Sequence, residues 1–302
     1  MAARCSATGA CFRAFAAPCA RRASAAVHVS SAQQPSSSGG AGGSGRRRGV
    51  LQLLAGGAAA GLMGSRSVAA AAAVDEAEQV LLDPQWPEQF PFRPEFFQRY
   101  DESSDADFYE QPRFVTHIDD GAIRALTKYY AEVFPASGSK DAALLDMCSS
   151  WISHYPEGYT AGRIAGLGMN EAELKRNSVL TEYAVKDLNE DPKLPYEDNS
   201  FDVITNAVSV DYLTRPIEVF KEMHRCLKPG GLAVMSFSNR CFPTKAIAMW
   251  TSTGDLDHIW IVGSYFHYSV PGGYSAPQAK DIGPTKKGSG DPMYVVFARK
   301  QA

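Results

Sequence analysis

"LPYEDNSFDVITNAVSVDYLTRPIEVFKEMHRCLKPGGLAVMSFSN" occupies residues 194–239, and this stretch decides the fold. Its apolar runs at 201–210 and 232–237 predict two buried strands. Between them a helix is expected to begin near Pro216, whose fixed φ suits a first turn, and to end at "KPGG" (228–231). The apolar stripe of this helix comprises Ile217, Phe220, Met223 and Leu227. A strand, a helix and a second strand in this order indicate a parallel sheet.

The same alternation extends to both sides of this stretch. Further strands are predicted at residues 142–147, 162–169, 183–188 and 292–300. A helix is expected after Asn170, a residue suited to the N-cap, and another after Asp119 or Asp120, ending before Pro135. The pattern predicts an α/β doubly wound fold with helices on both faces of a mostly parallel sheet.

The stretch resembles a known family. Its "LPYEDNSFD" start and its helix end closely resemble the class I S-adenosylmethionine-dependent methyltransferases of the type 11 family. The matching residues at the helix end are Glu222, Arg225, Leu227, Lys228, Pro229, Gly230 and Gly231. The segments "LLDMCSSWISHYP" (144–156), "GLGMN" (166–170) and "SFSNRCFPTKAIAMW" (236–250) resemble a branch shared by plants and photosynthetic bacteria. The resemblance implies a seven-stranded, Rossmann-like sheet and S-adenosylmethionine as the cofactor.

The resemblance also implies a cofactor site at the strand ends, with departures from the family pattern. Asp146 matches the acid that ends the first strand, but small residues replace the glycines that follow it in the family. The loop is expected to contact the cofactor through Met147, Cys148, Ser149 and Ser150, with a Ser hydroxyl able to donate to its carboxylate. The ribose acid of the family is replaced by Gly168, beside Met169 and Asn170. Asn170 either contacts the ribose or only caps its helix.

The resemblance implies that Asp187 and Leu188 bind the adenine of the cofactor. The alternative for Asp187 is a solvent-exposed charge in a loop without a binding role. Asn206 is expected to line the cofactor and substrate face. The candidate catalytic residues are His154, Asp211 and Tyr212, although packing or hydrogen-bonding roles are alternatives for each.

Three further residues near the expected site have both a functional and a structural interpretation. His117 belongs either to a lid or to a helix start, and Arg240 binds either an anionic substrate group or a surface acid. Cys241 is expected to be a packed thiol.

The charge is distributed unevenly along the 302 residues. Residues 1–74 contain eight arginines and no Asp or Glu, which leaves 22 of the 30 basic residues against all 33 acidic ones and a charge of about −11. This acidic remainder argues against nucleic-acid binding. The cysteines form no CxxC pair, so neither a zinc site nor a disulfide framework is indicated.

Residues 1–74 have the composition of a plastid transit peptide. Arg47 and Arg48 precede an apolar run, and small residues near 71–73 suit cleavage, which resembles a twin-arginine signal and favours the thylakoid lumen over the stroma. A plain stromal or mitochondrial signal is the alternative. The apolar run is too short to predict a membrane span. Residues 75–118 are expected to form an extended, partly ordered arm, and residues 119–302 the methyltransferase-like domain.

Three functions are compatible with these patterns, in descending order of support. The first is S-adenosylmethionine-dependent methyl transfer in the plastid to a small-molecule or protein acceptor. The second is a catalytically inactive binding or scaffold protein, which the replaced glycines and the missing ribose acid favour. The third, a nicotinamide-dependent oxidoreductase, lacks the GxGxxG turn that it needs after the first strand. The sequence specifies neither the acceptor nor an oligomeric state.

Overall fold

The structure is a computed structural model that describes residues 75–284 and 290–302. The targeting signal expected in residues 1–74 lies outside the described residues. Seven strands form one sheet in the order β3-β2-β1-β4-β5-β7-β6. They are β1 Ser139–Met147, β2 Ala161–Gly168, β3 Glu182–Val185, β4 Phe201–Ala207, β5 Leu227–Phe237, β6 Gln278–Asp281 and β7 Tyr294–Arg299. The first five strands pair in parallel and β7 pairs antiparallel with both neighbours, which confirms the predicted doubly wound, methyltransferase-type sheet.

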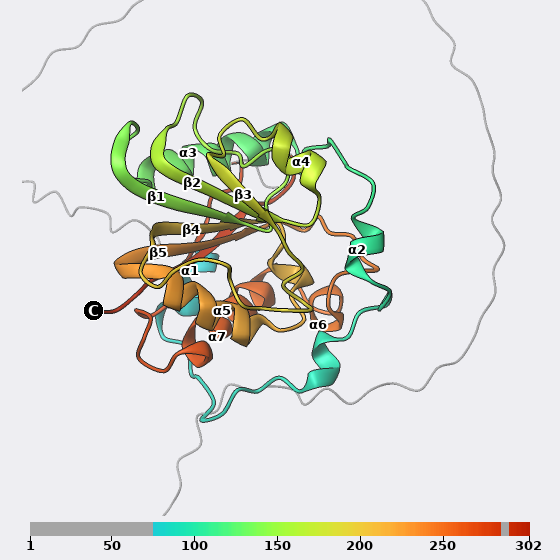
Figure 1. The fold of residues 1–302 in the computed structure, drawn as a ribbon. Coiled ribbons are helices and arrows are strands. Elements are labelled where there is room, and N and C mark those ends of the chain that lie inside the picture. The colour runs from blue at the N-terminus through green and yellow to red at the C-terminus, as the bar shows by residue number, and fades with distance from the viewer. Residues whose placement is uncertain (1–74, 285–289) are drawn as a thin grey trace, which may run out of the picture. The chain divides into compact units, whose positions relative to one another are not determined.

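Helices cover both faces of this sheet (Figure 1). The helical elements are α1 Glu76–Leu82, η1 Pro94–Phe97, α2 Asp105–Phe108, α3 Asp120–Val133, α4 Glu171–Arg176, η2 Val210–Tyr212, α5 Pro216–Cys226, α6 Ala248–Thr251 and α7 Asp255–Ser269. One core layer contains Leu126 and Tyr130 of α3. The layer on the opposite face packs Phe220 of α5 against Phe266 of α7. No helix of the described part of the chain is both long and apolar enough to span a membrane.

Local chemistry explains where several of these elements begin and end. The Asp119 carboxylate accepts a hydrogen bond from the Ala122 amide and caps α3, as the sequence predicted. Several predicted boundaries are wrong, and the third strand ends at Val185 instead of Leu188. Leu227 begins β5 instead of ending the preceding helix. The fourth strand ends at Ala207, because Val208 adopts a φ of 44° that a strand cannot continue.

The residues that carry the family resemblance form a structural clamp away from the strand ends. The Arg225 guanidinium donates to the Glu222 carboxylate, to the carbonyls of Leu194 and Tyr196 and to the Asp198 carboxylate. These bonds join α5 to the loop that leads into β4. The motif therefore secures the fold, and the chemistry of the site rests on other residues.

The arm, residues 75–118, is more ordered than the sequence predicted. It contains a true helix, α1, which the Asp75 carboxylate caps and which buries Ala77 and Leu81. Leu81 lies so close to Gly263 of α7 that a Cβ there would approach it to 2.7 Å. Beyond η1 the arm passes along the side of the molecule at which the parallel strands end (Figure 1). It thus covers the edge where ligands bind in doubly wound folds.

A buried ionic cluster holds the arm to the domain. Asp105 accepts two hydrogen bonds from Arg99, both of 2.7 Å, and lies 3.3 Å from the Lys245 ammonium. All three side chains are at least nine-tenths buried. Because Lys245 lies in the loop before α6, the cluster joins segments about 140 residues apart in the chain.

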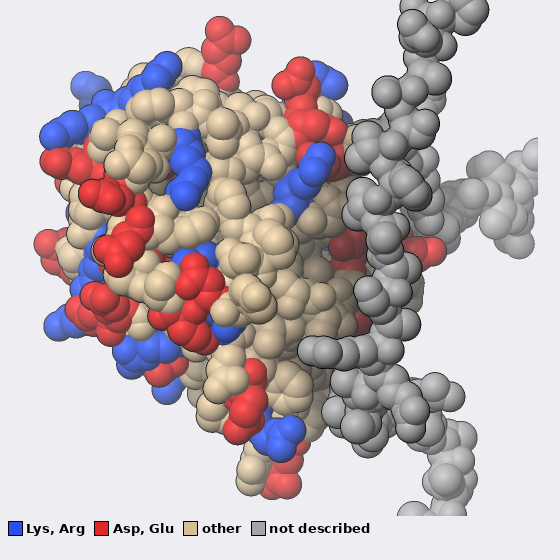
Figure 2. Space-filling view, turned by 90° about the vertical axis from the view of Figure 1, so that its right-hand side faces the viewer, with Lys and Arg blue, Asp and Glu red and all other residues tan. Residues whose placement is uncertain are grey.

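Figure 2 shows the side of the molecule along which the arm runs. Where the described residues are visible, Lys and Arg are interspersed with Asp and Glu, and uncharged side chains cover much of the middle. A nucleic-acid site would gather basic residues on one face. The expectation that this chain does not bind nucleic acid stays a prediction, and the visible face agrees with it.

Candidate functional site

A cavity of about 340 Å³ lies at the carboxyl ends of β1 to β4. Its volume falls at the small end of the range for ligand pockets. The structure gathers around it most of the site residues that the sequence singled out: Asp146, Cys148, Ser149, Ser150, His154, Gly168, Met169, Asn170, Asp187, Leu188 and Tyr212, together with His117, Arg240 and Cys241. Because parallel strands bring their ends to one edge, residues far apart in sequence meet here.

Three predicted site residues do not line the cavity. Met147 is fully buried in the core, because alternate residues of a strand face opposite sides. Asn206 is also fully buried, and its amide donates to the Met147 carbonyl at 3.3 Å. Asp211 is 2% exposed beneath the cavity wall, where its Oδ2 has no hydrogen-bond partner and burial raises its pKa to about 8. The expected cofactor and acceptor contacts of Met147, Asn206 and Asp211 therefore stay predictions that their side-chain positions do not support.

The carboxylate of Asp146 holds the loop after β1 in place. Oδ2 of this buried acid accepts hydrogen bonds from the hydroxyls of Ser149 at 2.6 Å and Ser153 at 2.7 Å. Burial raises the Asp146 pKa to about 6, and these hydrogen bonds act against that rise. Since Ser149 commits its only hydroxyl proton to Asp146, it has none to donate to a cofactor carboxylate.

Cys148 occupies a position that favours glycine. Its φ is 58°, in the left-handed region, where a side chain costs about 1–2 kcal/mol of strain. The side chain lines the cavity, so the thiol takes space that a glycine would leave open. Burial raises its pKa to about 12, so the group is a neutral thiol at pH 7.

The end of β2 explains why no acid stands there. A Cβ on Gly168 would lie 2.2 Å from the Ser149 carbonyl oxygen, well inside van der Waals contact. The β1 loop therefore fills the space that an aspartate side chain would need. Gly168 lines the cavity with its backbone alone.

Asn170 caps α4 and holds the arm. Its Oδ1 accepts from the Glu173 amide at 3.1 Å, and its Nδ2 donates to the carbonyls of Tyr109 and Glu110 at 2.9 and 3.0 Å. Both amide protons are thus used. The capping interpretation is confirmed, and the ribose contact is not.

Glu173 is a cavity residue that the sequence reasoning missed. Its side chain lines the cavity and is 7% exposed, and its Oε1 accepts from the Arg113 backbone amide at 2.6 Å. Burial raises its pKa above the usual range. Its place one turn into the helix that follows β2 was the available signal, because that turn faces the strand end.

The loop after β3 connects the arm to the cavity. The Asp187 Oδ1 accepts from the Asn189 backbone amide at 2.8 Å. The Asn189 side chain then donates to Asp105 at 2.9 Å and to the Tyr212 carbonyl at 3.0 Å. Leu188, buried between them, gives this end of the cavity an apolar wall.

Two candidate catalytic residues line the cavity. The Tyr212 hydroxyl accepts from the Phe242 amide at 2.8 Å, and it lies beside the buried Asp211 carboxyl. His154 has a φ of 56°, and its Nδ1 is buried without a partner. Burial lowers the His154 pKa to about 4, so the imidazole is neutral at pH 7 and able to accept a proton.

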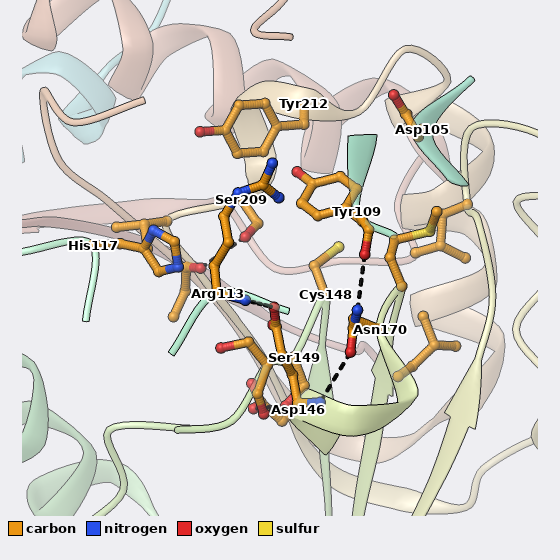
Figure 3. Close-up of a pocket in the computed structure, with 18 of the residues that line it drawn as sticks. Asp105, Tyr109, Arg113, His117, Asp146, Cys148, Ser149, Asn170, Ser209 and Tyr212 are labelled. Atoms are coloured by element: carbon orange, nitrogen blue, oxygen red, sulfur yellow. Dashed lines mark hydrogen bonds between the residues drawn. The ribbon is translucent and has the colours of Figure 1, made fainter. Parts of the chain in front are cut away.

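The arm contributes Asp105, Tyr109, Arg113 and His117 to the cavity wall. Figure 3 shows Tyr109, Arg113 and His117 directed into the same space as Cys148 and Tyr212. The sequence suggested only His117 as part of a lid, since the arm has no periodic pattern. Across the described residues, no group of three or more His, Cys, Asp or Glu side chains is arranged to hold a metal ion.

Comparison with known proteins agrees with this geometry. Residues 149–235 match the family model of a methyltransferase domain, type 11. A demethylmenaquinone methyltransferase of Staphylococcus epidermidis is 31% identical over 102 residues, which are 32% of this chain and 42% of that relative. A ubiquinone/menaquinone biosynthesis C-methyltransferase of a Ruegeria species is 50% identical over 46 residues, 15% of this chain and 18% of the relative. The chain thus spans less than half the length of these relatives.

Solved structures also match the chain. The [4+2]-cyclase SpnF matches with a TM-score of 0.46 and 16% identity, over 65% of this chain and 92% of that one. An S-adenosylmethionine-dependent methyltransferase of Mesorhizobium loti matches with a TM-score of 0.41 and 18% identity, over 58% of this chain and 98% of that one.

Proposed function

We propose that this chain, whose residues 149–235 match the family model of a type 11 methyltransferase domain, transfers the methyl group of S-adenosylmethionine to an acceptor in the cavity. The observation that carries the proposal is the cavity at the ends of β1 to β4, which gathers the loops that a cofactor of this kind needs. The two methyltransferase relatives named above carry quinones in their names, but this chain spans less than half the length of either. The acceptor of this chain must therefore be argued from its own cavity.

The residues present fit the cofactor, with substitutions. Asp187 and Leu188 offer a carboxylate and an apolar wall for the adenine. Glu173, buried in the wall one turn beyond β2, is the remaining acid on the ribose side, where Gly168 has no side chain. The amino-acid end of the cofactor would lie against Cys148 where the family has a glycine. The thiol narrows this part of the cavity without closing it.

Methyl transfer from this cofactor requires few catalytic side chains. When bound, the cofactor supplies an electrophilic methyl group, and the chain must hold the acceptor in line with it and exclude water. Tyr109 and Arg113 of the arm form part of the cavity wall. Where an acceptor must lose a proton, neutral His154 is the base that the cavity provides, because Asp146 is already bound by two serines.

Binding without turnover is the second candidate. The strained Cys148 and the occluded Gly168 favour it, because both narrow the room around the cofactor. Opposing it, both replacements are small, and the cavity remains open. The two candidates make different predictions for transfer but the same prediction for binding.

Replacing Cys148 with Gly is expected to tighten binding of S-adenosylhomocysteine about threefold to tenfold. The glycine accepts the positive φ without strain and removes the thiol from the amino-acid end. The free energy of unfolding should change by less than about 1 kcal/mol, because relief of strain offsets the greater freedom of the unfolded glycine. Calorimetric titration of the full-length protein measures the affinity.

Cys241→Ala is the matched control for this variant, since it alters the other thiol of the cavity wall and should leave the affinity unchanged. If Cys148→Gly binds more weakly than the wild type, the thiol itself makes a favourable contact, and the interpretation of Cys148 as an obstacle is wrong.

Transfer is tested with cofactor labelled with tritium in its methyl group. Full-length protein is incubated with a small-molecule extract of its source, and label in products other than the cofactor is counted. The proposal expects label with the wild type and at least about tenfold less with Asp187→Ala. No label above the protein-free background with the wild type, together with clear binding of S-adenosylhomocysteine, would refute turnover and support binding alone.

We also propose a plastid location, with the thylakoid lumen favoured over the stroma. The composition of residues 1–74 and the Arg47–Arg48 pair support it. Mass spectrometry of the N-terminus of the mature protein tests it. A start near Ala73 supports the lumen, a start before Arg46 supports the stroma, and retention of Met1 would contradict both.

A further inference from the structure

Arg113 extends from the arm into the cavity, and one nitrogen of its guanidinium makes no hydrogen bond. Its Nη2 donates to the Phe108 carbonyl at 2.9 Å, whereas its Nη1 is buried without any hydrogen-bond partner. Figure 3 shows the guanidinium between the rings of Tyr109 and Tyr212. A buried donor without an acceptor costs about 1–3 kcal/mol, and more for a charged group, so a ligand oxygen at this point would be strongly favoured.

Aromatic rings surround the Arg113 guanidinium, and the Glu173 carboxylate attracts it without forming a salt bridge. Its guanidinium carbon lies 4.4 Å from the ring centre of Phe108, 5.7 Å from that of Tyr109 and 5.5 Å from that of Phe242. In the part of the chain that the structure describes, no carboxylate forms a salt bridge with it. Cation–π contacts engage the faces of the rings and leave the N–H groups at the edge of the guanidinium available to an anion.

The position of Arg113 favours the acceptor over the cofactor. Phe242 follows β5 and Tyr212 follows β4, whereas the residues expected to hold the cofactor follow β1, β2 and β3. Arg240, the arginine that the sequence offered for an anion, pairs with Asp291 at 2.7 Å. Lys186 of the cavity wall pairs with Asp191, so among the cations that line the cavity Arg113 is the one without a salt bridge.

We propose that Arg113 recognises a carboxylate or phosphate on the methyl acceptor, which is therefore a small anion with an apolar body beside the charge. The inference rests on the proposed function, and it adds the substrate class. The rings of Tyr109, Tyr212 and Phe242, which line the cavity, would pack against the apolar body. The cofactor itself carries a carboxylate, so the test must separate the two sources of the same chemistry.

Benzoate and benzamide are suitable probes, because they share a ring and differ in charge. Calorimetry on the full-length protein compares their affinities with and without saturating S-adenosylhomocysteine. We expect benzoate to bind at least about tenfold more tightly in both states, the effect of one charge-assisted hydrogen bond. Arg113→Gln should abolish this preference and Arg113→Lys should retain part of it, while Arg240→Gln, the matched control, should keep it. If Arg113→Gln fails to fold, the reduced preference for benzoate in Arg113→Lys tests the proposal in its place.

Three results would overturn the proposal. They are equal affinity for the two probes, a preference that survives Arg113→Gln, and a preference that disappears when S-adenosylhomocysteine is bound. The last result would assign Arg113 to the carboxylate of the cofactor. If S-adenosylhomocysteine does not bind and the Arg113-dependent preference persists, the anion site stands and methyl transfer is refuted.

Discussion

Asp105→Ala is expected to lower the free energy of unfolding by about 3–5 kcal/mol. The substitution leaves Arg99 and Lys245 buried next to each other without the carboxylate that they share. Removing the buried partner of an ionic cluster costs far more than the cluster contributes, because the two buried cations then keep only the more exposed carboxylates of Glu102 and Asp101. Urea denaturation of the full-length protein, followed by circular dichroism, measures the change.

Asp101→Ala is the control for this prediction. Asp101 lies 3.4 Å from the same Lys245, but its side chain is 35% exposed, so its loss should cost much less than the loss of Asp105. The Asp105 variant should also release the arm, which hydrogen exchange at Tyr109 and Arg113 would detect as lost protection. A cost as small as that of the control would mean that the arm is not held by this cluster.

Gly168→Asp, which restores the acid usual in the family, is expected to destabilise the protein by about 3 kcal/mol instead of improving cofactor binding. The new Cβ would meet the Ser149 carbonyl oxygen at 2.2 Å and Leu174 at 3.2 Å. The backbone at this point cannot yield easily, because the Ser149 amide donates to the Leu167 carbonyl at 2.7 Å. Gly168→Ala should cost about as much, since the clash arises at Cβ.

Gly254→Ala serves as the control, because the nearest atom to a Cβ there is 3.8 Å away. It should cost less than about 1 kcal/mol in the same urea titration. If Gly168→Asp is stable and binds S-adenosylhomocysteine more tightly than the wild type, the loop after β1 is mobile enough to readmit a ribose acid, and the occlusion argument is wrong.

Much of the fold could be predicted from local patterns. The apolar runs predicted six of the seven strands but not β6, the stripe from Ile217 to Met223 predicted α5, and Asp119 and Asn170 predicted two helix starts. These features depend on neighbours in sequence. The order of the strands depends on contacts between distant segments, and the local patterns do not determine it.

The features that could not be predicted from the sequence depend on contacts between distant segments. Met147 and Asn206 belong to strands whose ends reach the site, but the pleat turns their side chains into the core. The arm has no period of its own, and its path is set by Asp105 and Lys245, which only the folded chain brings together. The positive φ of Cys148 likewise has no sequence signal, because the residue that would reveal it is the glycine that has been replaced.

Calorimetric titration of the full-length protein with S-adenosylhomocysteine tests the central claim most directly, that this cavity is a cofactor site. The account predicts binding at micromolar concentration that weakens at least about tenfold in Asp187→Ala. Asp191→Ala removes a neighbouring acid that pairs with Lys186 and does not line the cavity, so it should bind as the wild type does. No heat from the wild type at millimolar ligand, or equal affinity in all three proteins, would contradict the claim.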